Sequence, residues 1–191
     1  RQDGDRGELV STPCELRLPS TLTGVLQARL DRLTPYERDI LQRAAVAGRV
    51  FWDKAIVVTA PPDVSSLEET LRQLEDREFI VRQSASSVPG AQEYAFKHAL
   101  LREVAYESVL VRRQRDFHWA IARWLGEQPG DRVAENAGLI ANHYELARDV
   151  HNAAQWYSRA AEQARAGYAP ETAISYYRKA LEMRRPEAPP P

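Results

Sequence analysis

Histidine and cysteine are the side chains best suited to acid–base, nucleophilic or metal chemistry near neutral pH, and the chain holds few of them. The four histidines are His98, His118, His143 and His151, and the one cysteine is Cys14. His118, His143 and His151 show no metal-ligand spacing with one another or with carboxylates, so we expect each at a helix surface or a packing seam. Cys14 has no histidine nearby in the sequence, which argues against nucleophilic catalysis. We therefore expect no catalytic residue, no metal site and no enzyme in this chain.

His98 differs from the other histidines because the hydrophobic pattern changes its period there. Tyr94 and Phe96 alternate with their neighbours as in a half-buried strand, and from residue 100 to 109 apolar residues recur at helical spacing. His98 is therefore expected at or near a helix N-terminus. Backbone N–H groups at that position bind anions, and an imidazole beside them can donate to a phosphate or carboxylate. The alternative is that His98 caps the helix or packs at a strand-to-helix corner.

Composition limits the classes of protein that this chain can represent. It has 191 residues, 43% of them apolar, and a formal charge of −1 from 26 basic and 27 acidic residues. One or two domains with packed cores are expected. The overall charge is close to zero, so it does not favour binding to nucleic acid or to an anionic membrane. One cysteine excludes an internal disulfide and fits a reducing compartment, and no apolar run approaches the ~18 residues of a membrane span. We expect a cytoplasmic protein without a membrane partner, and its start at Arg1 predicts a piece of a longer protein.

The first part of the chain contains signals for a linker and then for helices. Residues 1–18 mix polar residues, glycine and proline, which is typical of a linker or a frayed end. Leucines at helical spacing predict a helix that follows Pro19 and ends near Arg32. Thr34 and Glu37 form a capping box, with proline at the first helical position, so a second helix is expected to begin there. It is expected to end at Gly48.

Residues 66–96 contain signals for a third helix followed by two strands. Residues 66–77 read as a helix, and residues 79–81 and 94–96 read as strands joined by a polar loop at 84–91. Three helices followed by a two-stranded hairpin is the winged-helix arrangement, in which this loop is the wing. We therefore expect a mostly α fold, with a winged-helix domain and a C-terminal helical extension over residues 19–127.

The usual function of a winged helix is to bind DNA, and the charges argue against it here. Residues 66–77, which occupy the recognition position, carry four carboxylates and two arginines. Phosphate neutralisation dominates DNA affinity, so this helix would repel the duplex. The wing contributes only Arg82, and Arg112, Arg113 and Arg115 are interpreted as a solvated helix end. Nucleic acid is therefore not the expected partner, and a DNA-binding transcriptional regulator is kept as the alternative function.

In the last third of the chain a pattern of small, aromatic and small residues recurs three times. Its tyrosines are Tyr144, Tyr157 and Tyr177, and the first and last are 33 positions apart. This spacing is close to the ~34-residue period of tetratricopeptide repeats. We expect such helical repeats over residues 131–185, with the tyrosines filling the grooves between helices, and a Pro-rich tail at 186–191. Roughly three repeats are needed for stability, so the array is expected to continue elsewhere; a plain helical bundle is the alternative.

Four stretches of the chain together resemble one family. They are LPSTLTGVLQARLDRLTPYERDILQRAAVAGRVFW, LEETLRQLEDREFIVRQ, YAFKHALLREVAYESVLVRRQRDFHWAIARWL and AAQWYSRAAEQA, within residues 19–183. This pattern resembles bacterial signal-transduction ATPases of the STAND class. It is most similar to the large regulators in which a nucleotidyl cyclase or a DNA-binding output domain is joined to an ATPase and to tetratricopeptide repeats.

The resemblance implies a regulatory role beside a nucleotide site. In that family a winged helix follows the P-loop ATPase core and packs on the nucleotide, and the repeats act as sensor or scaffold. This chain contains no G-x-x-x-x-G-K-[ST] motif, so the ATP or ADP site is expected upstream, in a longer parent protein, and no cofactor is expected in this segment. The expected partners are that upstream ATPase domain and a protein or neighbouring subunit bound through the repeats.

The same resemblance gives His98 a specific role. Related apoptosome and plant-resistance ATPases carry a Met-His-Asp motif in the winged helix, and its histidine contacts the bound diphosphate. Lys97-His98-Ala99 lies at the similar place, with lysine in place of methionine and alanine in place of aspartate. The resemblance therefore implies that His98 is a nucleotide-contact residue.

Overall fold

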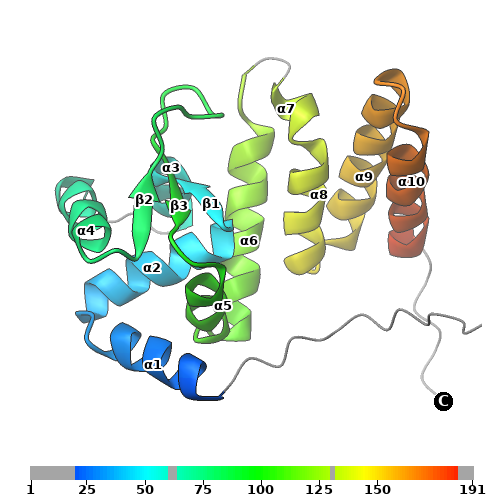
Figure 1. The fold of residues 1–191 in the computed structure, drawn as a ribbon. Helices are drawn as coiled ribbons and strands as arrows, with labels where there is room; N and C mark the ends of the chain where they lie inside the picture. The colour runs from blue at the N-terminus through cyan, green and yellow to red at the C-terminus, as the bar shows by residue number, and fades with distance from the viewer. Residues whose placement is uncertain (1–19, 60–63, 130–131, 185–191) are drawn as a thin grey trace, which may run out of the picture.

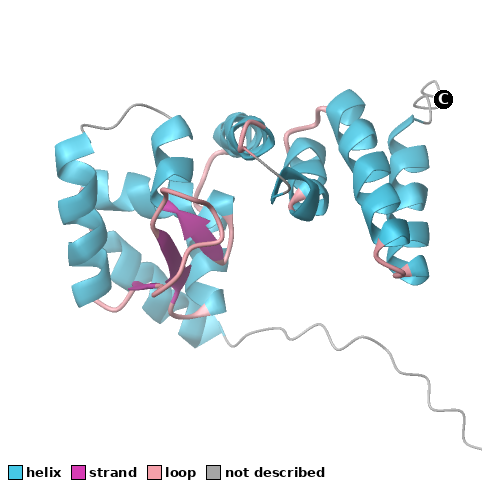
Figure 2. Cartoon of the chain, turned by 90° about the horizontal axis from the view of Figure 1, so that it is seen from above, coloured by secondary structure: helices cyan, strands magenta, loops and turns pink. Residues whose placement is uncertain are grey.

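The computed structural model describes residues 20–59, 64–129 and 132–184. The predicted linker at 1–18, Cys14 and the Pro-rich tail at 186–191 lie outside these residues. In the described part the fold is mostly α, with one small sheet (Figures 1 and 2). The helices are α1 (Ser20–Asp31), α2 (Pro35–Ala47), α3 (Asp53–Thr59), α4 (Val64–Asp76), α5 (Ala99–Glu107), α6 (Val111–Gly126), α7 (Arg132–Glu135), α8 (Ala137–Leu146), α9 (Val150–Ala166) and α10 (Pro170–Arg184). The strands are β1 (Val50–Trp52), β2 (Ile80–Arg82) and β3 (Glu93–Phe96).

The predicted start and end of α2 are confirmed. The Thr34 hydroxyl accepts a hydrogen bond from the Glu37 backbone at 3.2 Å, and the Glu37 carboxylate accepts one from the Thr34 backbone at 2.7 Å. Gly48 ends the helix with φ of 142°, and its N–H donates to the Ala44 carbonyl at 3.1 Å. These local groups satisfy backbone atoms that the helix leaves without partners. Glu37 also pairs with Arg77 at 2.9 Å, which joins the start of α2 to the residue that follows α4.

The sheet has one strand more than the two-stranded hairpin predicted from the sequence. Its order is β1-β3-β2 and both pairings are antiparallel, with Phe51 opposite Tyr94 and Val81 opposite Ala95. β1 escaped prediction because its partner β3 lies far later in the chain, so no hairpin turn marks it, whereas β2 and β3 are joined by the recognised loop. Residues 53–59, for which no element was predicted from the sequence, form α3, and Ile56 within it is fully buried.

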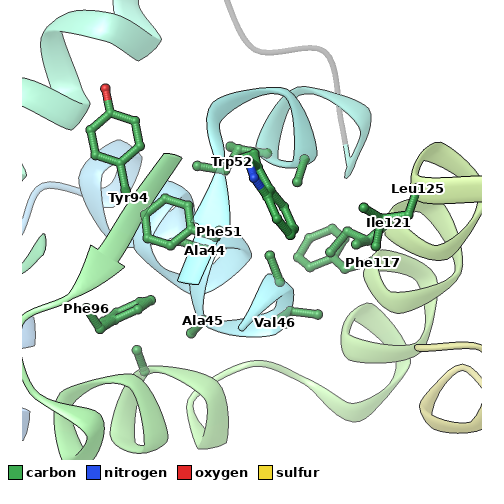
Figure 3. Packing of buried hydrophobic residues seen from close by; sticks show 14 of the residues in the cluster. Ala44, Ala45, Val46, Phe51, Trp52, Tyr94, Phe96, Phe117, Ile121 and Leu125 are labelled. Atoms are coloured by element: carbon green, nitrogen blue, oxygen red, sulfur yellow. The ribbon is translucent and has the colours of Figure 1, made fainter. Parts of the chain in front are cut away.

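One contiguous core runs from the sheet to the C-terminal helices, and α6 lies in its middle. Phe51 stacks on Tyr94 with ring centroids 5.7 Å apart, and Trp52 meets Trp124 of α6 at 5.8 Å. Figure 3 shows Phe117 and Ile121 of α6 pointing toward Trp52. On its other side α6 packs against α8, and Figure 1 shows it standing between the sheet and the row formed by α8, α9 and α10.

The C-terminal helices pack in sequence, α8 on α9 and α9 on α10. Tyr144 and Tyr157 are buried as expected, but Tyr177 is 38% exposed, so its assignment to a groove between helices was wrong. The adjacent Tyr176 takes that place and stacks on Tyr157 with centroids 5.9 Å apart. No helix of the described residues is long and apolar enough to span a membrane.

Gly138 allows Tyr176 of α10 to approach α8. A Cβ added at Gly138 would lie 2.8 Å from Cζ of the Tyr176 ring, which is too close for real carbon atoms. The ring cannot retreat freely because its face is stacked on Tyr157. Glycine at this position of α8 therefore lets the Tyr176 ring of α10 pack against both α8 and Tyr157 of α9.

Gly138→Val is expected to lower the free energy of unfolding by about 1–3 kcal/mol, the range for overpacked cores. Urea denaturation measures this change. Gly24→Val is the matched control, because nothing lies within 4 Å of its added Cβ, and it should change stability by less than about 0.5 kcal/mol. Equal effects of the two substitutions would contradict the assigned contact.

Candidate functional site

His98 lies at the join of a strand and a helix, as the change of period predicts. It is the N-cap residue of α5, with extended backbone angles of −130° and 131°, directly after β3 and Lys97. Its side chain is exposed and makes no capping hydrogen bond. His98 therefore occupies the N-cap position, but its side chain neither forms a capping hydrogen bond nor is buried in the corner. The imidazole remains available to a group outside the described residues.

The surface around His98 is rich in positive charge. Lys97 forms an ion pair with Glu78, and Arg29 donates to the Arg77 carbonyl at 3.1 Å. The Lys97 ammonium holds the pKa of the exposed Glu78 carboxyl below its usual value, and Arg29 and His98 act in the same direction. We call Arg29, Lys97 and His98 the basic corner. Glu78 is the carboxylate that the described residues place against it.

Arg29 of the basic corner and the neighbouring Arg77 both lie against the aromatic ring of Phe79. The guanidinium of Arg29 lies 4.9 Å from the centroid of Phe79, and that of Arg77 lies 5.6 Å from it. Cation–π contacts of this kind hold a flexible side chain in one position. The basic corner is therefore an ordered positive surface next to the first turn of α5, where backbone N–H groups also favour anions.

A large hollow lies elsewhere, between α3, α4, the sheet and α6, and has a volume of about 1000 Å³. Its walls carry charges of both signs, including Asp53 and Glu68 against Lys54 and Arg82. Burial raises the pKa of the Tyr94 hydroxyl that lines it; Arg82 opposes this shift, while the carboxylates of Asp53, Glu75 and Glu68 add to it. This mixed surface does not have the single sign that would attract a phosphate chain.

The basic cluster at the start of α6 is only in part the solvated helix end that we expected. Arg112 and Arg115 are exposed. Arg113 instead contacts Asp39 of α2 at 2.7 Å, and its guanidinium lies 5.0 Å from the centroid of Phe117. Arg113 thus fastens α6 to α2 and is not free to track a nucleic-acid backbone.

A buried pair of histidines was missed in the sequence. His118 of α6 and His143 of α8 were expected at a helix surface or a packing seam, and they meet in the seam between these helices with their Nδ1 atoms 2.8 Å apart. Nε2 of His118 lies 3.1 Å from the Tyr106 hydroxyl, whereas Nε2 of His143 has no partner with hydrogen-bond geometry. The signal that could have found them is their helical spacing from buried apolar residues, since Ile121 lies three positions after His118 and Ile140 three positions before His143.

Both histidines of the pair are held neutral by their surroundings. Burial lowers the pKa of His118 to about 3 and that of His143 to about 4. The charge of Arg102 acts in the same direction on both, and the backbone of Ala47 opposes it weakly at His143. No group of three or more metal-ligating residues is present where the chain is described, so the pair has no further ligands for a metal site.

A third polar cluster joins the C-terminal helices. The Tyr157 hydroxyl of α9 donates to the Glu145 carboxylate of α8 at 2.5 Å, and Lys179 of α10 lies 3.0 Å from the same hydroxyl. Burial raises the pKa of Tyr157 far above its ordinary value, and the hydrogen bond to Glu145 adds to the shift. A tyrosine acting as base or nucleophile needs the opposite shift. The contacts of this cluster therefore favour a role in fastening the three helices.

Tyr157→Phe is expected to lower the free energy of unfolding by about 1–2 kcal/mol, because it leaves Glu145 and Lys179 without their shared hydroxyl. Tyr177→Phe is the matched control, since that side chain is partly exposed and its hydroxyl has no hydrogen bond to another described residue. Chemical denaturation at pH 7 compares the two variants. A control that is as destabilised as Tyr157→Phe would refute the fastening role.

Comparisons with known proteins give one distant relative. No protein-family model matches the chain, and no solved structure matches it significantly. An uncharacterized protein of Rhizobium meliloti (strain 1021) is 27% identical over 172 residues, which cover 86% of this chain and 16% of that protein. The chain therefore spans about a sixth of the length of the relative that it matches.

Proposed function

We propose that this chain is a non-catalytic regulatory segment of a STAND-class signalling ATPase. Its sheet-containing part acts as a winged helix that latches onto an upstream nucleotide-binding domain, and its C-terminal helices act as a tetratricopeptide-like sensor or scaffold. The single observation that carries this proposal is the exposed, unpartnered His98 at the start of α5, within the basic corner. The proposed compartment is the cytoplasm.

The order of elements supports the winged-helix part of the proposal. From α2 onward the chain runs helix, strand, helix, helix, strand, loop, strand, and β1 pairs with β3 across the sheet. This order is that of winged helices, with α4 in the recognition position and residues 83–92 as the wing. The matched segment of a much longer bacterial protein supports the view that such a unit works inside a multidomain chain.

The basic corner supports contact with a diphosphate. Phosphate oxygens prefer charge-assisted hydrogen bonds, and Arg29, Lys97 and His98 offer donors beside the N-terminal turn of α5. Each such bond contributes about 1.5–3 kcal/mol when made to a charged group. We infer that His98 contacts the ADP of the adjoining ATPase and stabilises the closed state, in which the two domains stay together.

His98→Ala in the longer protein, extended through the proposed P-loop, is expected to weaken ADP retention by about 10-fold or more. Nucleotide content after purification and the rate of ADP release measure this effect. His151→Ala is the matched control, because His151 is also exposed but lies on α9 and contacts only Gln155 among the described residues. Equal ADP retention by wild type and a folded His98→Ala variant would overturn the assigned contact.

The negative charge of α4, the helix in the recognition position, argues against DNA binding as the function of this chain. Arg72 is paired with Glu69, and the Arg82 backbone N–H donates to Glu75. Both donors near α4 are therefore already bound to carboxylates of the same helix. We expect no duplex binding by this chain beyond the micromolar non-specific range at physiological salt. Fluorescence anisotropy at two salt concentrations tests it, and tight, salt-sensitive binding would favour the alternative, a DNA-binding transcriptional regulator.

The outer face of α10 supports the scaffold role. Ile174, Tyr177 and Leu181 share one helix face and are 51%, 38% and 65% exposed. The aromatic positions of the same pattern in α8 and α9, Tyr144 and Tyr157, are covered by neighbouring helices. We propose that a further helix, from an extended array or from a neighbouring subunit, covers this face.

If a neighbouring subunit covers this face, the wild-type chain should self-associate with rising concentration in sedimentation velocity, and the double variant Ile174→Gln with Leu181→Gln should not. Its stability should stay within about 0.5 kcal/mol of wild type, because both side chains are exposed. Val25→Gln, at an exposed site on α1, is the control and should leave association unchanged. Association that survives the double variant would place the contact on another face.

A further inference from the structure

The seam between α6 and α8 joins the two parts of the chain, and the histidine pair lies inside it. His118 and His143 are 1% and 2% exposed, and their ring centroids are 5.0 Å apart. α9 and α10 follow α8 and pack on it in turn. The α6–α8 seam is therefore the main attachment of the C-terminal helical part, with Trp156 of α9 beside Gly126 of α6 as a further contact.

Hydrogen-bond geometry allows at most one proton between the two rings. Nδ1 atoms 2.8 Å apart need one donor and one acceptor. A consistent chain runs from the Tyr106 hydroxyl to Nε2 of His118, from Nδ1–H of His118 to Nδ1 of His143, and leaves Nε2–H of His143 facing the backbone of Ala47. If both rings were imidazolium, two N–H groups would point at each other across this distance.

The charges around the seam oppose even one proton on the pair. Arg102 of α5 is fixed nearby, because it donates to the Ala45 carbonyl of α2 at 2.8 Å and lies over the Tyr106 ring. No carboxylate is among the groups that shift the pKa of either histidine. The carboxylates that act near this seam, Glu127 and Asp149, influence Tyr144 instead. Glu145 of α8 is engaged on the α9 side with Tyr157 and Lys179.

We propose that the His118–His143 pair is an acid-sensitive joint, which keeps α8, α9 and α10 docked on α6 while both imidazoles are neutral and releases them when protons bind. The ligand of this site is the proton itself. The proposal does not depend on the role of His98, because the two sites share no residue.

The direction of the pH effect follows from the lowered pKa values. A histidine exposed by opening of the seam titrates near 6.5, whereas the folded values are about 3 and about 4, so the opened state binds protons first. The stabilisation is complete above pH 6.5 and is lost as pH falls toward 4. At pH 5 the opening equilibrium should increase about 30-fold for each histidine exposed, and roughly 1000-fold for both.

Amide hydrogen exchange at pH 7.5 and pH 5, corrected for intrinsic rates, tests the joint in the wild-type chain. We expect protection to fall at least about 30-fold in α8, α9 and α10 and to fall less in the sheet. In the same samples the imidazole signals of His118 and His143 should not titrate between pH 6 and 7. Titration of His118 and His143 between pH 6 and 7 in the folded chain would overturn the proposal.

Substitutions distinguish protonation of the His118–His143 pair from the effect of acid on other groups of the protein. His118→Phe with His143→Leu replaces the pair with apolar side chains of similar size, so opening of the seam should become independent of pH between 7.5 and 5. His151→Gln, which removes an exposed histidine, should keep the full pH dependence. If the double variant does not fold, the wild-type titration decides. Unchanged pH dependence in a folded double variant would show that the joint lies elsewhere.

Discussion

The two-sided burial of α6 is the constraint on which the rest of the structure depends. Phe117, Ile121 and Leu125 belong to the core that reaches the sheet, while His118 faces α8. Apolar burial is strong but has no direction, so it does not by itself fix the rotation of a helix with two buried sides. Contacts with defined geometry do so here. Arg113 binds Asp39 near one end of α6, and the histidine pair joins its middle to α8.

Signals that act within a few residues predicted most of the helices correctly. Thr34 and Glu37 bond backbone groups at the start of α2, and Gly48 does so at its end, so the sequence alone is sufficient to recognise both ends of this helix. The position of His98 at the start of α5 belongs to the same class, because it depends on a local change from strand to helix periodicity. Its exposure, in contrast, depends on how the surrounding elements pack.

Features that join distant residues could not be predicted in this way. β1 pairs with a strand far later in the chain, with Phe51 opposite Tyr94, and no neighbouring turn in the sequence marks this pairing. His118 and His143 are 25 positions apart, and each helix offers several faces on which a histidine can lie. Tyr176 rather than Tyr177 meets Tyr157 because the rotation of α10 is set by its contact with α9. These outcomes depend on packing between elements and not on propensity.

The close approach of Tyr176 to Gly138 has a consequence for the divergence of this sequence. Two positions 38 residues apart share one small volume, because the ring of one occupies the space that a side chain of the other would need. A homologous chain can therefore acquire alanine or a larger residue at position 138 only if position 176 loses its aromatic ring or α10 moves away from α8. Substitutions at these two sites should be inherited together, and an alignment of homologues would record them as a correlated pair.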